Sequence, residues 1–90
     1  MVRPIREISY SSQFARAYKK LLPGLRREAA KREQWFRANA VDPRLRTHKL
    51  RGRFSGFWSF SISYSHRIVF TFESRDTVVF HDVGDHRVYR

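Results

Sequence analysis

The chain has 90 residues, no cysteine, and a formal net charge of +11 at neutral pH from 19 basic and 8 acidic side chains. Its length predicts a single domain spanning residues 1–90, and the lack of cysteine excludes a disulfide framework, a thiolate nucleophile and a thiolate metal site. The sequence has no signal-peptide core and no apolar run of about 18 residues, so we expect a cytoplasmic protein without a membrane span.

The positive charge is concentrated in the first part of the chain. Residues 1–53 carry 15 basic and 4 acidic side chains, whereas residues 54–90 carry 4 of each, and 15 of the 19 basic residues are arginine. The arginine guanidinium binds phosphate with two parallel hydrogen bonds and is weakly hydrated. We therefore expect a nucleic acid or a strongly acidic protein as partner, the alternative being a charged surface that only keeps the protein soluble.

The first half of the chain predicts a strand and then two helices. Residues 5–10 are typical of a short opening strand, and Ser11 or Ser12 can cap the helix that follows. Apolar residues at helical spacing line that first helix until Pro23-Gly24 ends it: Phe14, Ala17, Tyr18, Leu21 and Leu22. A second helix over about residues 25–39 has an apolar face interrupted by Arg32: Leu25, Ala29, Phe36 and Ala40.

The second half predicts three strands. In residues 57–64 large apolar side chains (Trp58, Phe60, Ile62, Tyr64) alternate with serines (Ser59, Ser61, Ser63). Residues 66–72 repeat this alternation, and a turn at residues 74–76 leads to a strand over residues 77–83 and a short tail. The order β-α-α-β-β-β predicts an α+β fold in which a helical hairpin packs on one face of a mostly antiparallel twisted sheet. We expect the serine-lined face to stay open and to carry the site.

Basic residues before and within the sheet are candidates for binding RNA or phosphate. Five cations without an acid stand between the second helix and the strands: Arg44, Arg46, Lys49, Arg51 and Arg53. They are typical of an element that follows a phosphate backbone, or of a solvated loop. Arg67, in mid-strand on the polar face, would stand in an unobstructed groove and could hold a scissile phosphate, although an ordinary solvent-facing residue is the alternative.

Histidines and one tyrosine complete the candidate site. Because imidazole suits proton transfer at neutral pH, His48 and His86 are candidates for acid–base work, while His66 and half-buried His81 are expected to be structural. Tyr89 could stack on a base or pack on the core. The histidine spacings fit no familiar metal-ligand pattern, so we expect neither a metal nor a cofactor.

The stretch from His48 to Phe70 contains two characteristic motifs. Residues 48–59 read H-K-L-R-G-R-F-S-G-F-W-S and residues 66–70 read H-R-I-V-F. In both, the chain resembles the RelE/ParE superfamily of type II toxins, and most of all the pattern L-K-G…G-F-W-S…I…H-R-L-V-Y of its YoeB and YafQ branches. The ending D-V-G-D-H-R-V-Y at residues 82–89 is similar to the I-G-T-H-x-x-V-Y ending of RelE-like and YafQ-like members. The match covers about residues 48–89, and the helices only in size and order.

The resemblance implies a ribosome-dependent mRNA endoribonuclease that cuts by 2′-hydroxyl attack without a metal. It implies Arg67 on the phosphate, His86 and His48 as the acid–base pair with His48 as base, and Tyr89 as the C-terminal aromatic residue; the acid and base assignments could be swapped. It also implies an acidic antitoxin as partner besides ribosomal RNA and mRNA.

The sequence departs from the pattern on the serine strand. RelE has lysines and YafQ a histidine where this chain has Ser59 and Ser61, and the YafQ aspartate falls at Ser65. The acid–base set is therefore smaller. Two alternatives follow: a ParE-like inhibitor of DNA gyrase, which does not need Arg67, His86 and His48, and an inactive toxin-like module that only binds an antitoxin.

Overall fold

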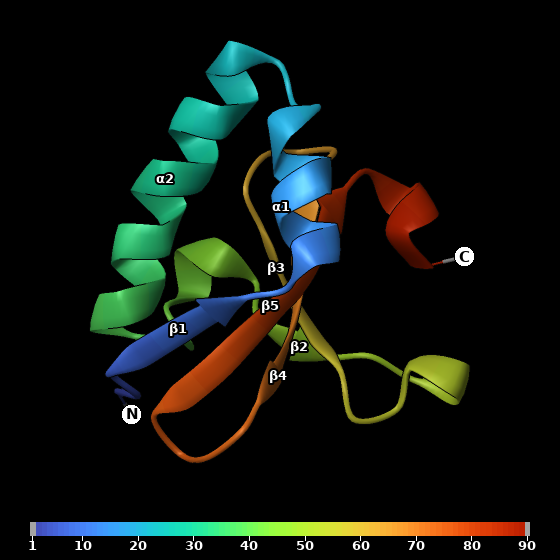
Figure 1. Ribbon diagram of the computed structural model, residues 1–90. Helices are drawn as coiled ribbons and strands as arrows, with labels where there is room; N and C mark the ends of the chain where they lie inside the picture. Colours follow the sequence, from blue (N-terminus) through green and yellow to red (C-terminus); the bar gives the residue numbers. More distant parts are fainter. Residues whose placement is uncertain (1, 90) are drawn as a thin grey trace.

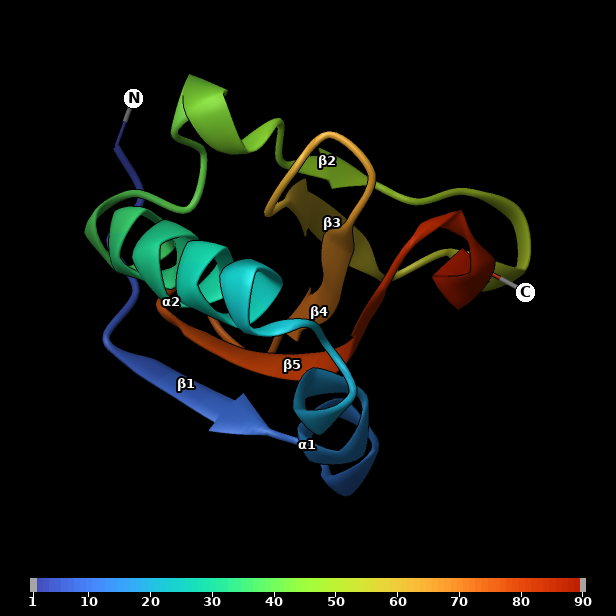
Figure 2. The ribbon, with the colours of Figure 1, turned by 90° about the horizontal axis from the view of Figure 1, so that it is seen from above.

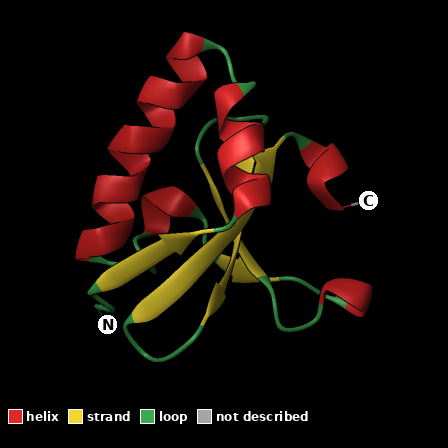
Figure 3. Ribbon diagram, in the orientation of Figure 1, coloured by secondary structure: helices red, strands yellow, loops and turns green. Residues whose placement is uncertain are grey.

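Five strands form one mixed sheet in the computed structural model, which describes residues 2–89 and only the backbone of Tyr89. The strands are β1 (Glu7–Tyr10), β2 (His48–Lys49), β3 (Trp58–Ser61), β4 (Arg67–Phe72) and β5 (Thr77–Gly84), in the spatial order β1-β5-β4-β3-β2 (Figures 1 and 3). Strand β1 is parallel to β5, and the other neighbours are antiparallel. The predicted α+β fold with a mostly antiparallel sheet is confirmed, and β2 is a strand that the sequence did not predict.

The two helices begin where short polar or cyclic residues favour a helix start. Helix α1 (Ser12–Lys19) is capped by the hydroxyl of Ser11, which accepts a hydrogen bond from the amide of Phe14 at 3.0 Å. Helix α2 (Pro23–Ala38) starts at Pro23, whose missing N–H costs nothing in a first turn. The sequence predicted a first helix that runs up to Pro23-Gly24, but α1 ends at Lys19, and Pro23 and Gly24 are the first two residues of α2. Leu22, expected on the apolar stripe, is the cap residue of α2 and is 71% exposed.

Both helices cover the same face of the sheet, as predicted. Phe80 of β5 contacts Phe14 of α1, with ring centroids 5.4 Å apart, and Phe36 of α2, with centroids 5.6 Å apart. Seen from above, the sheet curves around α2 (Figure 2). The curvature follows from the right-handed twist of strands and lets one helix contact several of them.

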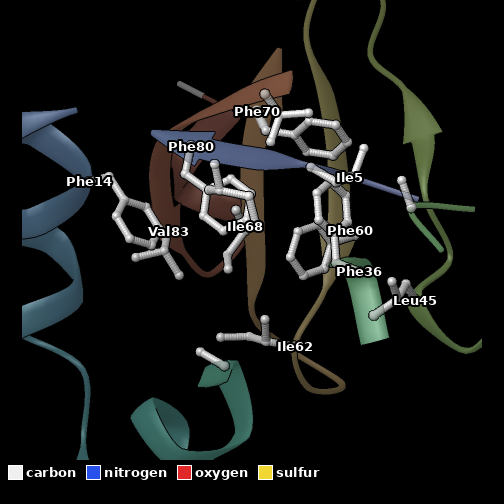
Figure 4. Packing of buried hydrophobic residues seen from close by; sticks show 14 of the residues in the cluster. Ile5, Phe14, Phe36, Leu45, Phe60, Ile62, Ile68, Phe70, Phe80 and Val83 are labelled. Atoms are coloured by element: carbon white, nitrogen blue, oxygen red, sulfur yellow. The ribbon is translucent and has the colours of Figure 1, made fainter. Parts of the chain in front are cut away.

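Four phenylalanines form the centre of the core. Phe36, Phe60, Phe70 and Phe80 are all fully buried. The ring of Phe36 stacks on Phe60 with centroids 4.7 Å apart and meets Phe70 edge to face at 4.9 Å (Figure 4). Since these rings come from α2, β3, β4 and β5, one cluster joins the helix to three strands. Aromatic pairs in such geometry stabilise the fold by more than the burial of their surface alone would.

Replacing Phe36 with alanine is expected to lower the free energy of unfolding by about 3–5 kcal/mol, because the cavity would lie among three other rings. Urea denaturation followed by circular dichroism measures this loss. Leu22→Ala, at an exposed position, is the control and should change the free energy by less than about 0.5 kcal/mol. Equal effects of the two substitutions would contradict the central place of Phe36 in the core.

The serine-lined face is covered, contrary to expectation. Ser59 is 0% and Ser61 6% exposed. On that face the ring of Phe57 packs edge to face against His81, with centroids 5.2 Å apart. Short serine side chains lie close to the backbone, so neighbouring residues cover them readily.

Strand β3 ends at Ser61, earlier than predicted. The amide of Ile62 donates to the carbonyl of His66 at 2.9 Å, which closes a turn between β3 and β4. Tyr64 lies in this turn and is 100% exposed, so its predicted place on the apolar face of a strand was wrong. Three short 3-10 helices also went unpredicted: η1 (Pro43–Leu45), η2 (Gly52–Phe54) and η3 (His86–Tyr89). Over residues 2–89 no helix combines the length and apolar character needed to cross a membrane.

Candidate functional site

A cationic hollow of about 750 Å³ lies at the end of the sheet where β3 turns into β4 and β5 ends. It is lined by Arg32, Arg44, Arg46, Ser61, Ser63, Tyr64, Ser65, His66, Arg67, Asp85 and His86. The lining contains four arginines, two histidines and a single carboxylate, so its charge favours the binding of an anion. Four of the sequence-predicted site residues meet here: Arg44, Arg46, Arg67 and His86.

Arg67 is fixed at the start of β4. It pairs with Ser61 of β3 on one side and with Gly84 of β5 on the other, and its Nη1 donates to the Ser61 hydroxyl oxygen at 2.5 Å. Arg67 is the first residue of the strand and not a mid-strand residue as predicted, and its half-buried side chain lines the hollow. A guanidinium has five N–H donors, and one hydrogen bond to a serine leaves donors for a bound anion.

His86 reaches the hollow because the chain after β5 folds directly back on the strand. A Cβ atom at Gly84 would lie only 2.7 Å from Cγ1 of Val88, so a larger residue at this position would force the Val88 side chain of η3 to shift. His86 is the first residue of η3 and is exposed. The hollow thus receives Arg67 from β4 and His86 from the tail beyond β5.

Asp85 is paired with Arg87 inside the same tail. Its Oδ2 lies 2.9 Å from Nη2 of Arg87, and its Oδ1 accepts from the Arg87 amide at 3.0 Å. The side-chain hydrogen bond from Arg87, followed by the backbone one, holds the pKa of the Asp85 carboxyl far below its usual range. Asp85 therefore stays negatively charged and neutralises Arg87 next to His86.

In an NMR titration the Asp85 carboxyl is expected to protonate well below the ordinary aspartate pKa of about 3.9. Because its pKa in the folded state is lowered, the stabilising pair with Arg87 is complete above the ordinary pKa and is lost as pH falls through the lowered one. Arg87→Ala should raise the Asp85 midpoint. It should leave Asp42, whose pKa is lowered by Arg44, unchanged. A midpoint for Asp85 that does not move in this variant would contradict the pairing.

The arginines of η1 form another wall of the hollow. Arg44 pairs with Asp42, with Nη2 2.8 Å from Oδ2, and its Cζ lies 3.8 Å from the centre of the Trp35 ring. The hydrogen bond from Arg44 lowers the pKa of Asp42. Arg46 is exposed and follows η1 in the left-handed conformation, with φ of 54°. Arg44 is therefore held in place by a carboxylate and a ring.

Arg32 belongs to the hollow and was missed as a site residue. Its Nη1 donates to the carbonyls of Ser61 and Arg44, at 3.3 Å each, and so connects α2 to β3 and to the end of η1. The signal in the sequence was a cation that interrupts the apolar stripe of the second helix. A half-buried arginine on a helix face that packs inward needs acceptors. Here the two backbone carbonyls supply them together with the Glu28 carboxylate, whose Oε1 lies 3.2 Å from Nε of Arg32.

His48 lies on the same face of the sheet as Arg67 but does not line the hollow. It pairs with Ser59, two residues from Ser61, which pairs with Arg67. Two strand spacings separate β2 from β4, or about 10 Å. His48 is exposed, and its Nδ1 lies 2.9 Å from the carbonyl oxygen of Arg46.

The remaining sequence-predicted residues lie elsewhere. Lys49 pairs with Trp58 and places its Nζ 5.6 Å from that ring, on the face opposite Arg67. Arg51 and Arg53 are exposed on either side of Gly52. The side chain of Tyr89 lies outside the described part of the chain.

Two histidines have neighbours that fit the structural roles expected of them. Nδ1 of His66 lies 2.8 Å from the Ser65 hydroxyl, and Nε2 of His81 lies 2.8 Å from the Thr71 hydroxyl. His81 is half-buried, as predicted. Among residues 2–89 no three histidine or acidic side chains are grouped as metal ligands would be.

The sheet order and the hollow define a small α+β protein with a cationic surface site. Comparisons with solved structures find other proteins with the same fold. No protein-family model and no curated relative matches the chain. Among solved structures, a YoeB/ParE toxin from Agrobacterium tumefaciens matches with a TM-score of 0.74 and 14% identity, over 90% of this chain and 99% of that one. A mutant of YafQ from E. coli matches with a TM-score of 0.72 and 16% identity, over 93% and 97%.

A third solved structure contains a toxin with its antitoxin. The RelBE2 toxin–antitoxin complex from Mycobacterium tuberculosis matches with a TM-score of 0.70 and 21% identity, over 96% of this chain and 94% of that one. The chain therefore has the fold of the RelE/ParE superfamily toxins, as the resemblance of residues 48–89 predicted.

Proposed function

We propose that the chain is the toxin of a type II toxin–antitoxin system and acts as a ribosome-dependent mRNA endoribonuclease, without a metal. The observation that supports this best is the hollow that gathers Arg67, His86, Arg44 and Arg46 from three separate parts of the chain. Cations bind the phosphates of a single strand, and an imidazole beside them can move a proton. The fold agrees with this function.

In the proposed reaction the 2′-hydroxyl of a ribose attacks the neighbouring phosphate. Arg67 would bind that phosphate and stabilise the additional negative charge of the transition state, which a bidentate guanidinium does well. One base must take the 2′-proton and one acid must protonate the leaving 5′-oxygen. We assign the acid to His86, which lines the hollow, and the base to His48; the reverse assignment uses the same two residues.

The position of His48 sets a condition on this mechanism. Because His48 lies two strands from Arg67 on the same face, it takes part only if the bound RNA runs across β3 toward β2. Arg46 connects the two regions, since it lines the hollow and its carbonyl contacts the His48 ring. The RNA path would then pass from η3 over Arg67 to His48.

The proposed partners are an acidic antitoxin, ribosomal RNA and mRNA, all in the cytoplasm. The net charge of +11 suits each of them, and binding to ribosomal RNA should weaken as salt rises because phosphate contacts release counterions. Two similar solved structures contain toxin with antitoxin, RelBE2 from Mycobacterium tuberculosis and YoeB–YefM from Staphylococcus aureus. An acidic antitoxin that wraps the chain would neutralise the same cations that bind RNA.

A second candidate function is an inactive module that only binds an antitoxin. It is favoured by the buried Ser59 and Ser61, which stand where the RelE and YafQ patterns carry catalytic side chains. A ParE-like gyrase inhibitor is the third, and the similar toxin from Agrobacterium tumefaciens is described as YoeB/ParE.

Induction of the protein followed by mapping of mRNA 5′ ends, with and without active translation, separates these functions. The proposal predicts cuts linked to codons that disappear when translation is blocked. Loss of DNA supercoiling without cuts would indicate a gyrase inhibitor. Unimpaired growth with antitoxin binding retained would indicate the inactive module.

A further inference from the structure

Tyr64 is a large aromatic side chain with no cover, at the rim of the cationic hollow. It is 100% exposed, and it belongs to the lining of the hollow together with Arg67, Arg46 and His86. Its neighbours in the chain, Ser63 and Ser65, are small. Both faces of the ring are therefore accessible from the side on which an RNA strand would lie.

The turn that carries Tyr64 is held together by its own hydrogen bonds. The hydroxyl oxygen of Ser63 accepts from the amides of Ser65, at 3.3 Å, and His66, at 3.1 Å. The Ile62 amide donates to the His66 carbonyl at 2.9 Å. Serine hydroxyls stabilise turns in this way. A fixed turn holds Tyr64 outward at little entropic cost when a ligand binds.

We infer that Tyr64 stacks on a nucleobase of the single-stranded RNA whose phosphate lies against Arg67. This inference rests on the proposed function and adds a binding residue to it. When a strand lies with its phosphates on arginines, its bases point away and become available for stacking. Proteins bind single strands through such a combination of cations and exposed aromatic rings.

The surroundings of Tyr64 favour RNA over a protein partner. The other large apolar residues that are exposed in the described chain, Val2, Tyr10, Leu22 and Val41, do not line the hollow. An aromatic anchor of a protein interface is normally surrounded by contacts that exclude water. Around Tyr64 the lining consists instead of serines, arginines, histidines and one carboxylate, Asp85, which is paired with Arg87.

The test measures binding of a short single-stranded RNA with 2′-O-methyl riboses, which cannot be cut by 2′-hydroxyl attack. Tyr64→Ala is expected to weaken binding by about 5- to 150-fold, and Tyr64→Phe, which keeps the ring, by less than about twofold. Tyr64→Leu keeps apolar bulk without a π face and should behave more like the alanine variant. An RNA of the same length with abasic nucleotides should bind wild type and Tyr64→Ala alike.

Three results would overturn the inference. The first is that wild type and Tyr64→Ala bind the base-containing RNA equally well. The second is that Tyr64→Ala weakens binding of abasic RNA as much as binding of base-containing RNA. The third is that Tyr64→Ala loses only the binding of the antitoxin. Cleavage is scored separately with unmodified mRNA. Wild type that stacks on RNA without cutting it contradicts the proposed nuclease and leaves the assignment of Tyr64 standing. If wild type cuts mRNA while Tyr64→Ala binds RNA unchanged, the proposed nuclease stands and the assignment of Tyr64 is contradicted.

Discussion

Replacing Arg67 with alanine is expected to abolish growth arrest and to lower translation-dependent mRNA cleavage by about 10²- to 10³-fold. The side chain is the cation that β4 places between Ser61 and Gly84, at the point where the tail brings His86 into the hollow. Without it, the charge that develops on the phosphate in the transition state loses the donor that lies between β3 and the tail carrying His86. Growth curves and the yield of codon-linked 5′ ends measure the effect.

Two further variants show whether the effect comes from geometry or from charge alone. Arg67→Lys keeps a positive charge but loses the planar fork, so an intermediate rate is expected. Arg75→Ala removes an exposed arginine from the turn between β4 and β5, far from the hollow, and should leave cleavage unchanged. Equal loss in Arg67→Ala and Arg75→Ala would reduce the role of Arg67 to net charge.

Replacing His86 with alanine is expected to slow cleavage by about 10²- to 10⁴-fold, the contribution of a positioned general acid. The fold should survive because His86 is exposed at the start of η3. The rate should also lose one limb of its pH dependence, because water would then have to protonate the leaving 5′-oxygen in place of His86. A single-turnover assay on programmed ribosomes at several pH values measures both quantities. If Arg67→Ala and His86→Ala both remain fully toxic, the hollow is not the active site.

The fold was predictable where residue patterns are local. Alternation of large and small side chains predicted β3 and β4, and the helical spacing around Phe14 and Phe36 predicted α1 and α2. The end of β3 was not predictable in this way, because Tyr64 continues the alternation while the Ser63 hydroxyl closes the turn. Strand β2, with two residues, is too short to show a period and exists through its pairing with β3.

The candidate site was predictable only in part, because it depends on convergence in space. Arg67 and His86 stand 19 positions apart in the sequence and meet because β5 pairs with β4 and the glycine at position 84 lets the tail fold back. The five basic residues between α2 and β3 separate in space. Arg44 in η1 and Arg46 just after it line the hollow, whereas Lys49 in β2 pairs with Trp58 on the other face. Neither Arg32 nor Tyr64 could be assigned without knowing which elements meet.

The chemistry at the cut ends tests the proposed nuclease most directly. RNA fragments from programmed ribosomes incubated with the purified protein should carry a 5′-hydroxyl on the downstream piece and a 2′,3′-cyclic phosphate on the upstream piece, because the 2′-oxygen is the nucleophile. These ends should appear at the exposed codon and be absent with Arg67→Ala. Fragments with 5′-phosphates, which water as the nucleophile would leave, or no fragments from wild-type protein, would contradict it.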